Sequence, residues 1–347
     1  MKFKNNRRAR IISTYIIGWI LAFMFLMIVR GSGTIERGSV QMDFVTALPV
    51  IFIFGIFFGS ISALAQIFTE ERIYQRISIQ KLLLLRVMYA IAFLFAIILI
   101  SYAMVITFFG VTISLKEYFI EPGSFAIYFY FITVDFFLTA LRQVNLMLGG
   151  NNLGKLITGR FYTPTEEERV FMFLDLQSST QHAERLGHIV YSKLIQDCFN
   201  DLGVVAKHDA EIYQYVGDEV VLTWKLNEAL KKQMCLHAYY AFANRLNKRA
   251  DYYEQNYQCK PFFKAGMHAG TVTVTEVGKY KKEIAYHGDA INTAARIQSK
   301  CNEYKAGLLV SGYLQSLLET EQFTFNELGA IPLRGKKEEV SIYSVTE

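Results

Sequence analysis

The sequence is poor in charge and in cysteine. Charged residues make up 19% of its 347 residues and hydrophobic residues 52%, whereas soluble globular domains carry about 25% charged residues. This balance excludes a disordered or fibrous protein and indicates a chain that is partly embedded in a membrane. The four cysteines all lie in the polar C-terminal half without a CxxC spacing, which favours reduced cytosolic thiols over a disulfide framework.

Long uncharged runs fill the first half of the chain. Three of them contain no charged residue at all: 11–29, 44–69 and 87–115. A fourth, about 125–148, is dense in aromatic residues but includes Asp135 and Arg142. Each run reaches the roughly 20 residues that a helical span needs. We therefore predict a four-helix transmembrane domain over residues 1–148. A cleaved signal peptide is disfavoured, because the first run lacks a small-residue cleavage site and three more runs follow.

Basic residues gather at alternate ends of these runs, which predicts the orientation. The basic connections are the N-terminus, the segment between the second and third runs, and the segment after the fourth run. We expect these three parts on the cytosolic side of an inner or plasma membrane, with the C-terminal half in the cytosol. An ionisable group inside a span, such as Asp135, is by default a functional candidate. We favour a paired or interfacial carboxylate, with Arg142 as its candidate partner.

The composition changes at Gly149, where glycines, charges and a Thr-Pro predict a linker over 149–165. A domain over 166–347 follows. Its patterns predict a buried strand (170–176), a helix (180–202), a hairpin around Gly217-Asp218, a helix (228–250), a strand pair (FFKAGMHAG and TVTVTEV), a helix from Asp289, and short strands at 307–310, 323–331 and 340–345. This order favours an α+β sandwich with helices on one face of a mostly antiparallel sheet.

Two acids lie at the ends of predicted strands. Asp175 ends the apolar strand, and Asp218 lies at the tip of the hairpin. If the two strands are neighbours, both carboxylates project from one edge of the sheet, where they suit a pair of Mg²⁺ or Mn²⁺ ions. The small residues that follow leave main-chain N–H groups at a helix start free to face phosphate: Ser178, Ser179 and Thr180. Taken alone, an Asp at a strand end is more often a cap or turn residue.

A third feature is the segment HGDAINTAARIQSK, which begins at His287. Asn292 and Arg296 are four residues apart, so they share one face of the predicted helix. An Asn can contact a sugar, and an Arg can stabilise charge on a transferring phosphoryl group. Without other motifs, such a pair is usually a solvated helix face.

In combination, these segments resemble the class III nucleotide cyclase family. Four stretches carry the resemblance, in the family's order over 166–347: FLDLQSST, YQYVGDEVVLTW, HGDAINTAARIQS and LGAIPLRGKKEEVSIYSV. The resemblance implies a ferredoxin-like βαββαβ core with extra strands. It also implies that Asp175 and Asp218, with the main-chain carbonyl of Leu176, bind two divalent cations.

The resemblance implies the remaining roles as well. Asn292 would orient the ribose, and Arg296 would stabilise charge around the α-phosphate while the 3′-hydroxyl attacks and pyrophosphate leaves. Arg334 falls near a position where the family often has a phosphate-contacting basic residue. Because metal acids and the Asn/Arg pair act across a dimer interface in this family, we expect a homodimer with two complete sites.

Two positions depart from the family's patterns for choosing the base. Adenylate cyclases often have Lys with Asp or Thr there, and guanylate cyclases often have Glu with Cys, whereas this chain has Gln214 and Ala285. Gln can donate and accept hydrogen bonds and so read either purine, and Ala285 offers no side-chain hydrogen bond. We favour ATP as the substrate; GTP or relaxed specificity stays open.

Two other classes of function compete with a membrane-anchored cyclase. A nucleotide receptor without turnover would be expected to lack a metal Asp or the Arg, and both are present. A transporter or channel with a regulatory domain would be expected to carry more intramembrane charge. The sequence contains no nucleic-acid-binding motif, so the expected partners are a nucleotide, a second copy and the bilayer.

Overall fold

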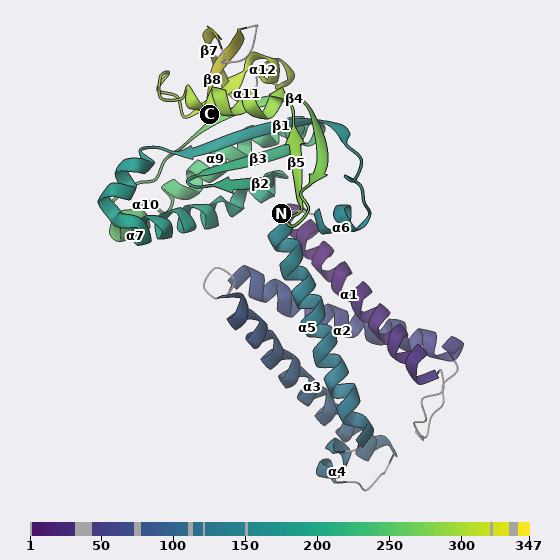
Figure 1. Cartoon of the computed structure of the whole chain (residues 1–347). Coiled ribbons are helices and arrows are strands. Elements are labelled where there is room, and N and C mark those ends of the chain that lie inside the picture. The colour runs from purple at the N-terminus through teal and green to yellow at the C-terminus, as the bar shows by residue number, and fades with distance from the viewer. Residues whose placement is uncertain are drawn as a thin grey trace. The chain divides into compact units, whose positions relative to one another are not determined.

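The structure is a computed structural model that describes eight stretches of the chain: residues 2–31, 44–72, 78–109, 114–120, 122–149, 152–319, 322–332 and 339–347 (Figure 1). Its internal contacts divide it into two compact units, Met1–Leu146 and Met147–Glu347.

The first unit is helical. Its helices are α1 (Lys2–Gly31), α2 (Phe44–Arg72), α3 (Ile79–Phe109), the short α4 (Leu115–Phe119) and α5 (Pro122–Leu148), which continues into the second unit. Four segments are long and apolar enough to cross a bilayer: Arg7–Val29, Leu48–Glu71, Gln80–Leu99 and Phe125–Leu148. The four spans predicted from the apolar runs are therefore confirmed as helices of sufficient length and hydrophobicity.

Glycines bring α1 and α2 close together. A Cβ atom added to Gly59 would lie 2.5 Å from the Cα atom of Ile16, and one added to Gly55 would lie 2.4 Å from a side-chain carbon of Ile20. Small residues at four-residue spacing allow helix backbones to approach in a membrane, where packing rather than hydrophobicity drives association. This GxxxG face is thus occupied within one chain.

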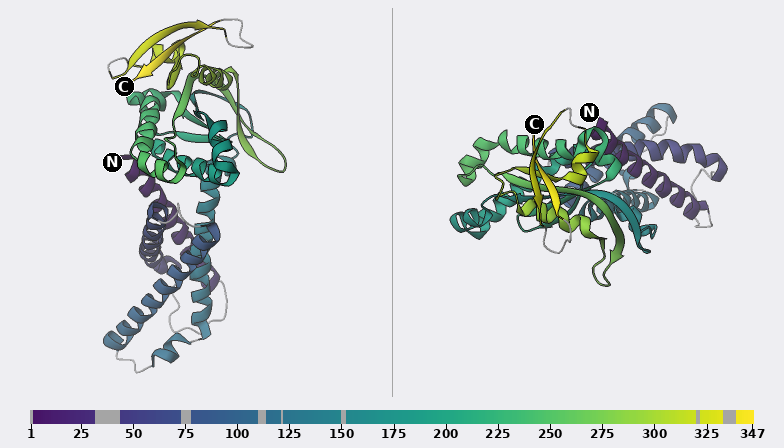
Figure 2. Two further views of the ribbon diagram at one scale, coloured as in Figure 1. Left: turned by 90° about the vertical axis from the view of Figure 1, so that its left-hand side faces the viewer. Right: turned by 90° about the horizontal axis from the view of Figure 1, so that it is seen from above.

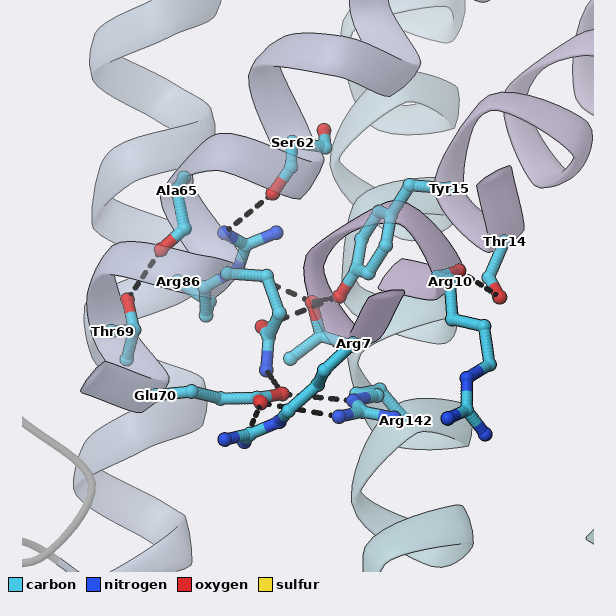
Figure 3. A network of polar contacts seen from close by, with 12 residues as sticks. Arg7, Arg10, Thr14, Tyr15, Ser62, Ala65, Thr69, Glu70, Arg86 and Arg142 are labelled. Carbon is cyan, nitrogen blue, oxygen red and sulfur yellow. Dashed lines mark hydrogen bonds and ion pairs between the residues drawn. The ribbon is translucent and has the colours of Figure 1, made fainter. Parts of the chain in front are cut away.

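Polar contacts of charged side chains join the four long helices (Figure 3). The carboxylate of Glu70 accepts hydrogen bonds from Arg142 at 2.8 Å and from Arg7 at 2.6 Å. Arg86, 1% exposed, pairs with Asp135 at 3.1 Å. Asp135 is therefore a paired carboxylate, but the expected partner was wrong. Arg142 is two turns further along the same helix, about 10 Å away, so a neighbouring helix supplies the partner instead.

The second unit is built on a mixed sheet of eight strands. Its strands are β1 (Thr165–Leu176), β2 (Glu211–Val216), β3 (Glu219–Lys225), β4 (Phe263–Val277), β5 (Glu283–His287), β6 (Leu308–Ser311), β7 (Thr324–Ile331) and β8 (Val340–Thr346). The order is β2-β3-β1-β4-β6-β8-β7, and β5 pairs with β4. All pairs are antiparallel except β4 with β6. The first four strands with α7 (Ser179–Leu202) and α9 (Met234–Asn247) form the expected βαββαβ core.

Helices cover both faces of this sheet, which corrects the expectation of one covered face. Along β1, Val170 and Met172 face a core shared with α7 and α9. The alternate residues Phe171 and Phe173 face a second core that includes Ala294 of α11 (Asp289–Ser299). A strand buried on both faces is apolar throughout rather than alternating, which is the pattern of 170–174.

The prediction of a strand pair in 262–277 is also wrong, because residues 263–277 form the single strand β4. Gly270 does not turn the chain. A Cβ atom there would lie 2.9 Å from Ala290, so this glycine makes room for α11. The turn follows at Gly278, where φ is +92°, and leads into β5, which the patterns did not predict. Figure 2 shows β4 and β5 as a long hairpin that extends beyond the rest of the sheet.

The helix predicted over 228–250 is broken into shorter pieces. They are α8 (Leu226–Leu230), a 3₁₀ turn (Lys231–Gln233), α9, and α10 (Ala250–Tyr257), which continues past the predicted end. Lys232 and Gln233 adopt positive φ angles of 51° and 53°, which an α-helix cannot include. The expected hairpin around Gly217-Asp218 and the three late strands are confirmed.

The predicted linker 149–165 contains a short helix, α6 (Asn152–Ile157), and ends at the start of β1. The side chain of Phe161, 2% exposed, lies in the core beneath α11. Its carbonyl accepts a hydrogen bond from the main chain of Glu276. Lys155 of α6 lies 3.7 Å from a carboxylate oxygen of Glu211 on β2.

Candidate active site

The pairing of β1 with β3 brings the two predicted metal acids together. Asp175 lies opposite Glu219 in the antiparallel register, so Asp218 at the hairpin tip is the next residue along. Asp175 and Asp218 are both partly exposed. The two strands are neighbours as expected, and the carboxylates share one edge of the sheet.

Electrostatics at this edge reflect an excess of negative charge. Burial and the neighbouring Asp218 carboxylate raise the pKa of Asp175, while a hydrogen bond from Gln298 and the charge of Lys264 oppose the shift. Burial, Asp175 and Asp218 raise the pKa of Glu219. Like charges held together disfavour ionisation, and a bound divalent cation removes that penalty.

The donor set suits Mg²⁺ or Mn²⁺. In the described part of the chain, no three His, Cys, Asp or Glu side chains are grouped to hold a metal ion. A cation here would depend on Asp175, Asp218, a main-chain oxygen such as that of Leu176, and oxygens of the substrate. Mg²⁺ is commonly bound in this way, by one or two carboxylates plus substrate phosphates.

The predicted phosphate-facing residues lie at the start of α7, directly after β1. Ser178 precedes the helix in a left-handed conformation with φ 58°, and its side chain makes no capping hydrogen bond. Ser179 and Thr180 form the first helical turn. First-turn N–H groups have no acceptor within a helix, so this turn offers donors beside the two acids.

Lys264 is a residue that the sequence reasoning missed. It lies opposite Asp175 in the pairing of β1 with β4 and is only 8% exposed. Its ammonium group donates to Asn302, and its charge helps keep Asp175 ionised. A lone Lys inside the apolar stretch FFKAGM was the available signal, because a buried Lys needs a partner.

The second predicted group lies on α11. The helix buries Ala290, Thr293, Ala294 and Ile297 against the sheet. Asn292 is exposed, and Arg296 is partly buried, with its Nη1 atom shielded from solvent and lacking a hydrogen-bond partner. A guanidinium nitrogen in that state is costly unless a ligand satisfies it.

The two acids and the Asn292/Arg296 pair lie on opposite sides of α11. Gln298, which hydrogen-bonds Asp175, is two residues beyond Arg296, and two residues turn a helix by about 200°. Asn292 lies one turn before Arg296, on the same flank as Arg296. Within one chain, the Asn/Arg pair is therefore directed away from Asp175 and Asp218 of that chain.

The two base-reading positions lie on β2 and β5. Gln214 follows an irregularity in the pairing of β2 with β3 and is exposed. Ala285 lies opposite Thr275 of β4 and is partly buried. Arg334, the predicted phosphate contact, lies outside the described residues.

Together, the βαββαβ core, the acid pair after β1 and β2, and the Asn/Arg helix have the arrangement that the resemblance to a nucleotide cyclase domain predicts. Residues 161–347 match the family described as "Adenylate and Guanylate cyclase catalytic domain". The chain belongs to this family.

Known relatives agree with this assignment. The chain is 31% identical to adenylate cyclase 2 of Rhizobium meliloti (strain 1021) over 206 residues, which cover 59% of this chain and 57% of that protein. It is 29% identical over 189 residues to adenylate cyclase 1 of the same organism, covering 52% of this chain and 27% of that one. The chain thus spans little more than half of the first relative and less of the second.

Among solved structures, a bacterial light-regulated adenylyl cyclase superposes with a TM-score of 0.54. The match has 17% identity and covers 65% of each chain. At this identity the likeness concerns the fold alone.

Proposed function

We propose that the protein is a membrane-anchored adenylate cyclase that converts ATP to 3′,5′-cyclic AMP and pyrophosphate as a homodimer. The observation that carries the proposal is the arrangement around α11: a close pair of acids on one flank and an unpartnered arginine nitrogen on the other. The relatives named as adenylate cyclases support ATP as the substrate.

In this proposal, Asp175, Asp218 and the Leu176 carbonyl would hold two divalent cations. Bound there, the cations would lower the pKa of the ribose 3′-hydroxyl and neutralise charge on the phosphate chain. Asn292 fixes the ribose, and Arg296 donates to oxygens of the α-phosphate, where charge develops as the 3′-oxygen–phosphorus bond forms and the bond to pyrophosphate breaks. Donors in the first turn of α7 receive the leaving phosphates.

A second copy of the chain completes each site. Asn292 and Arg296 turn away from the acids of their own chain, so they would serve the acids of the other chain. A two-fold dimer gives two such sites, because each contact between copies occurs twice.

GTP is the second candidate substrate, favoured by one observation. Gln214 is exposed on β2 and can rotate its amide to donate or accept. The two base-reading positions hold neither a lysine nor an acid, so neither side chain restricts the site to adenine.

The four apolar helices would anchor the enzyme in the inner or plasma membrane. The distribution of basic residues supports an N-terminus and a catalytic unit on the cytosolic side.

The test is product formation by the full-length protein in detergent. ATP, GTP, CTP and UTP are supplied separately with Mn²⁺ and then Mg²⁺, products are separated by chromatography, and Asp218→Ala is the control. Cyclic AMP from the wild type alone supports the proposal. A different cyclic nucleotide would replace the substrate, and no product from a folded dimer would favour a nucleotide receptor without turnover.

A further inference from the structure

A buried arginine links the two strands that carry the base-reading positions. Arg169 of β1 is 1% exposed, although it carries a full charge. Its guanidinium donates to Thr223 of β3 at 3.0 Å, to Glu167 at 2.7 Å and to Glu211 of β2 at 2.5 Å. Three strands are therefore held by one side chain.

The same guanidinium lies over an aromatic ring of β5. Its central carbon is 4.8 Å from the ring centre of Tyr286, close enough for a cation–π interaction. The Tyr286 ring in turn meets Tyr213 of β2 edge to face, with ring centres 4.9 Å apart and an angle of 75°. A main-chain hydrogen bond from Tyr286 to the Tyr213 side chain adds to this contact.

These aromatics are the direct chain neighbours of the base-reading residues. Tyr213 precedes Gln214, and Tyr286 follows Ala285. In the sheet, β3, β1 and β4 separate β2 from β5, so no direct ladder of hydrogen bonds joins these two strands. The stack of Arg169, Tyr286 and Tyr213 makes direct side-chain contact between them.

We propose that Arg169 is a positioning residue for nucleobase selection, acting through Tyr286 and Tyr213 on the spacing of Gln214 and Ala285. The inference rests on the proposed function and adds the physical origin of its base preference. Ala285 makes no side-chain hydrogen bond, and the Gln214 amide suits either purine after rotation. Discrimination between bases therefore depends on where the two strands hold the base rather than on the chemistry of these two side chains.

The test compares Arg169→Met with a matched control, Arg249→Met, in the full-length protein. Arg249 makes the same kinds of contact elsewhere: an ion pair with Asp201 at 2.6 Å and a ring contact with Tyr252 at 4.0 Å. Both variants are expected to lower the melting temperature. Only Arg169→Met is expected to raise KM for the preferred purine nucleotide more than it lowers kcat, and to reduce the ratio of kcat/KM between ATP and GTP about tenfold.

A second pair of variants keeps the proposal testable if Arg169→Met does not fold. Tyr286→Phe keeps the ring and should retain the wild-type ratio, whereas Tyr286→Leu removes the ring and should reproduce the loss. An unchanged ratio in both Arg169→Met and Tyr286→Leu, with melting temperatures lowered as in Arg249→Met, would assign Arg169 to stability alone and overturn the proposal.

Failure of the proposed function is separable from failure of this inference. If the wild type forms no cyclic product, the catalytic proposal fails. The same variants are then compared by the binding of fluorescent N-methylanthraniloyl derivatives of ATP and GTP in the presence of Mn²⁺. The Kd for the disfavoured nucleotide divided by the Kd for the preferred one should still fall in Arg169→Met. An unchanged ratio would refute the role of Arg169 independently.

Discussion

Two inactive variants should restore activity to each other if each site is shared between chains. Asp218→Ala removes one of the two proposed metal ligands, and Arg296→Ala removes the arginine on the opposite flank of α11. Losing one group that stabilises the transition state costs about a hundredfold or more in kcat. In a mixed dimer, one site combines both lesions, and the other combines the intact Asp218 of one chain with the intact Arg296 of the other.

The recovered activity follows from this geometry. A mixed dimer has one functional site of two, so purified mixed dimers should show about half of the wild-type turnover per dimer. Random assembly of equal amounts yields about half mixed dimers, so an unfractionated mixture should show about a quarter. This signal exceeds the background of either variant by more than tenfold. The assay is cyclic nucleotide formation after co-expression with two tags and tandem purification.

A matched control reverses the expectation. When one chain carries both substitutions and the other is wild type, a shared-site dimer has a lesion in each site and should be inactive. If each chain instead formed a complete site alone, this control would keep half of the turnover and the mixture of single variants would stay inactive. That pattern, with mixed dimers shown to form, would refute the flank argument.

Three further predictions concern stability. The raised pKa of Asp175 means that the folded state binds a proton more tightly than the unfolded state, so this group destabilises the fold as pH rises through the raised pKa. Asp175→Asn should therefore raise the melting temperature in EDTA at neutral pH, with no gain below pH ~4; a uniform gain at all pH values would contradict this. Arg86→Met should cost about 3–5 kcal/mol of unfolding free energy in detergent by leaving Asp135 buried and unpaired. Adding Asp135→Leu should recover most of it, and a double variant as unstable as the single one would count against the pair. Gly59→Ala should lower the melting temperature more than Gly18→Ala, because the added carbon meets the Ile16 backbone rather than the movable end of Leu138; equal effects would argue against backbone contact between α1 and α2.

Features with a local cause were predictable from the sequence. Apolar runs of sufficient length predicted the four long helices, since length and hydrophobicity suffice for a helix in a bilayer. Gly217-Asp218 between two apolar runs predicted a hairpin, because Gly supplies the positive φ of 63° that the turn requires. The positions of Asp175 and Asp218 at strand ends could be predicted in the same way.

Features that depend on distant neighbours were not predictable. Gly270 has the same local pattern as a turn glycine, yet it faces α11 across the sheet. Asp135 was assigned a partner on its own helix, because one sequence does not tell which helix lies beside it. Arg169 was not predicted for the same reason, since only strand pairing brings Thr223 and Glu211 to it. The apolar stretch around Lys264 signals a buried lysine, but not that the pairing of β1 with β4 places it opposite Asp175.

The contrast between local and distant causes also applies to the preference for one nucleobase. In a site where Lys and Asp, or Glu and Cys, contact the base, the side chains encode the preference and the sequence reveals it. In this chain, Gln214 suits both purines, and Ala285 makes no hydrogen bond at all. A preference must then arise from main-chain placement, which the Arg169–Tyr286–Tyr213 stack controls. Substitutions at Gln214 alone should then change affinity for both purines together, whereas disruption of the stack should change their ratio.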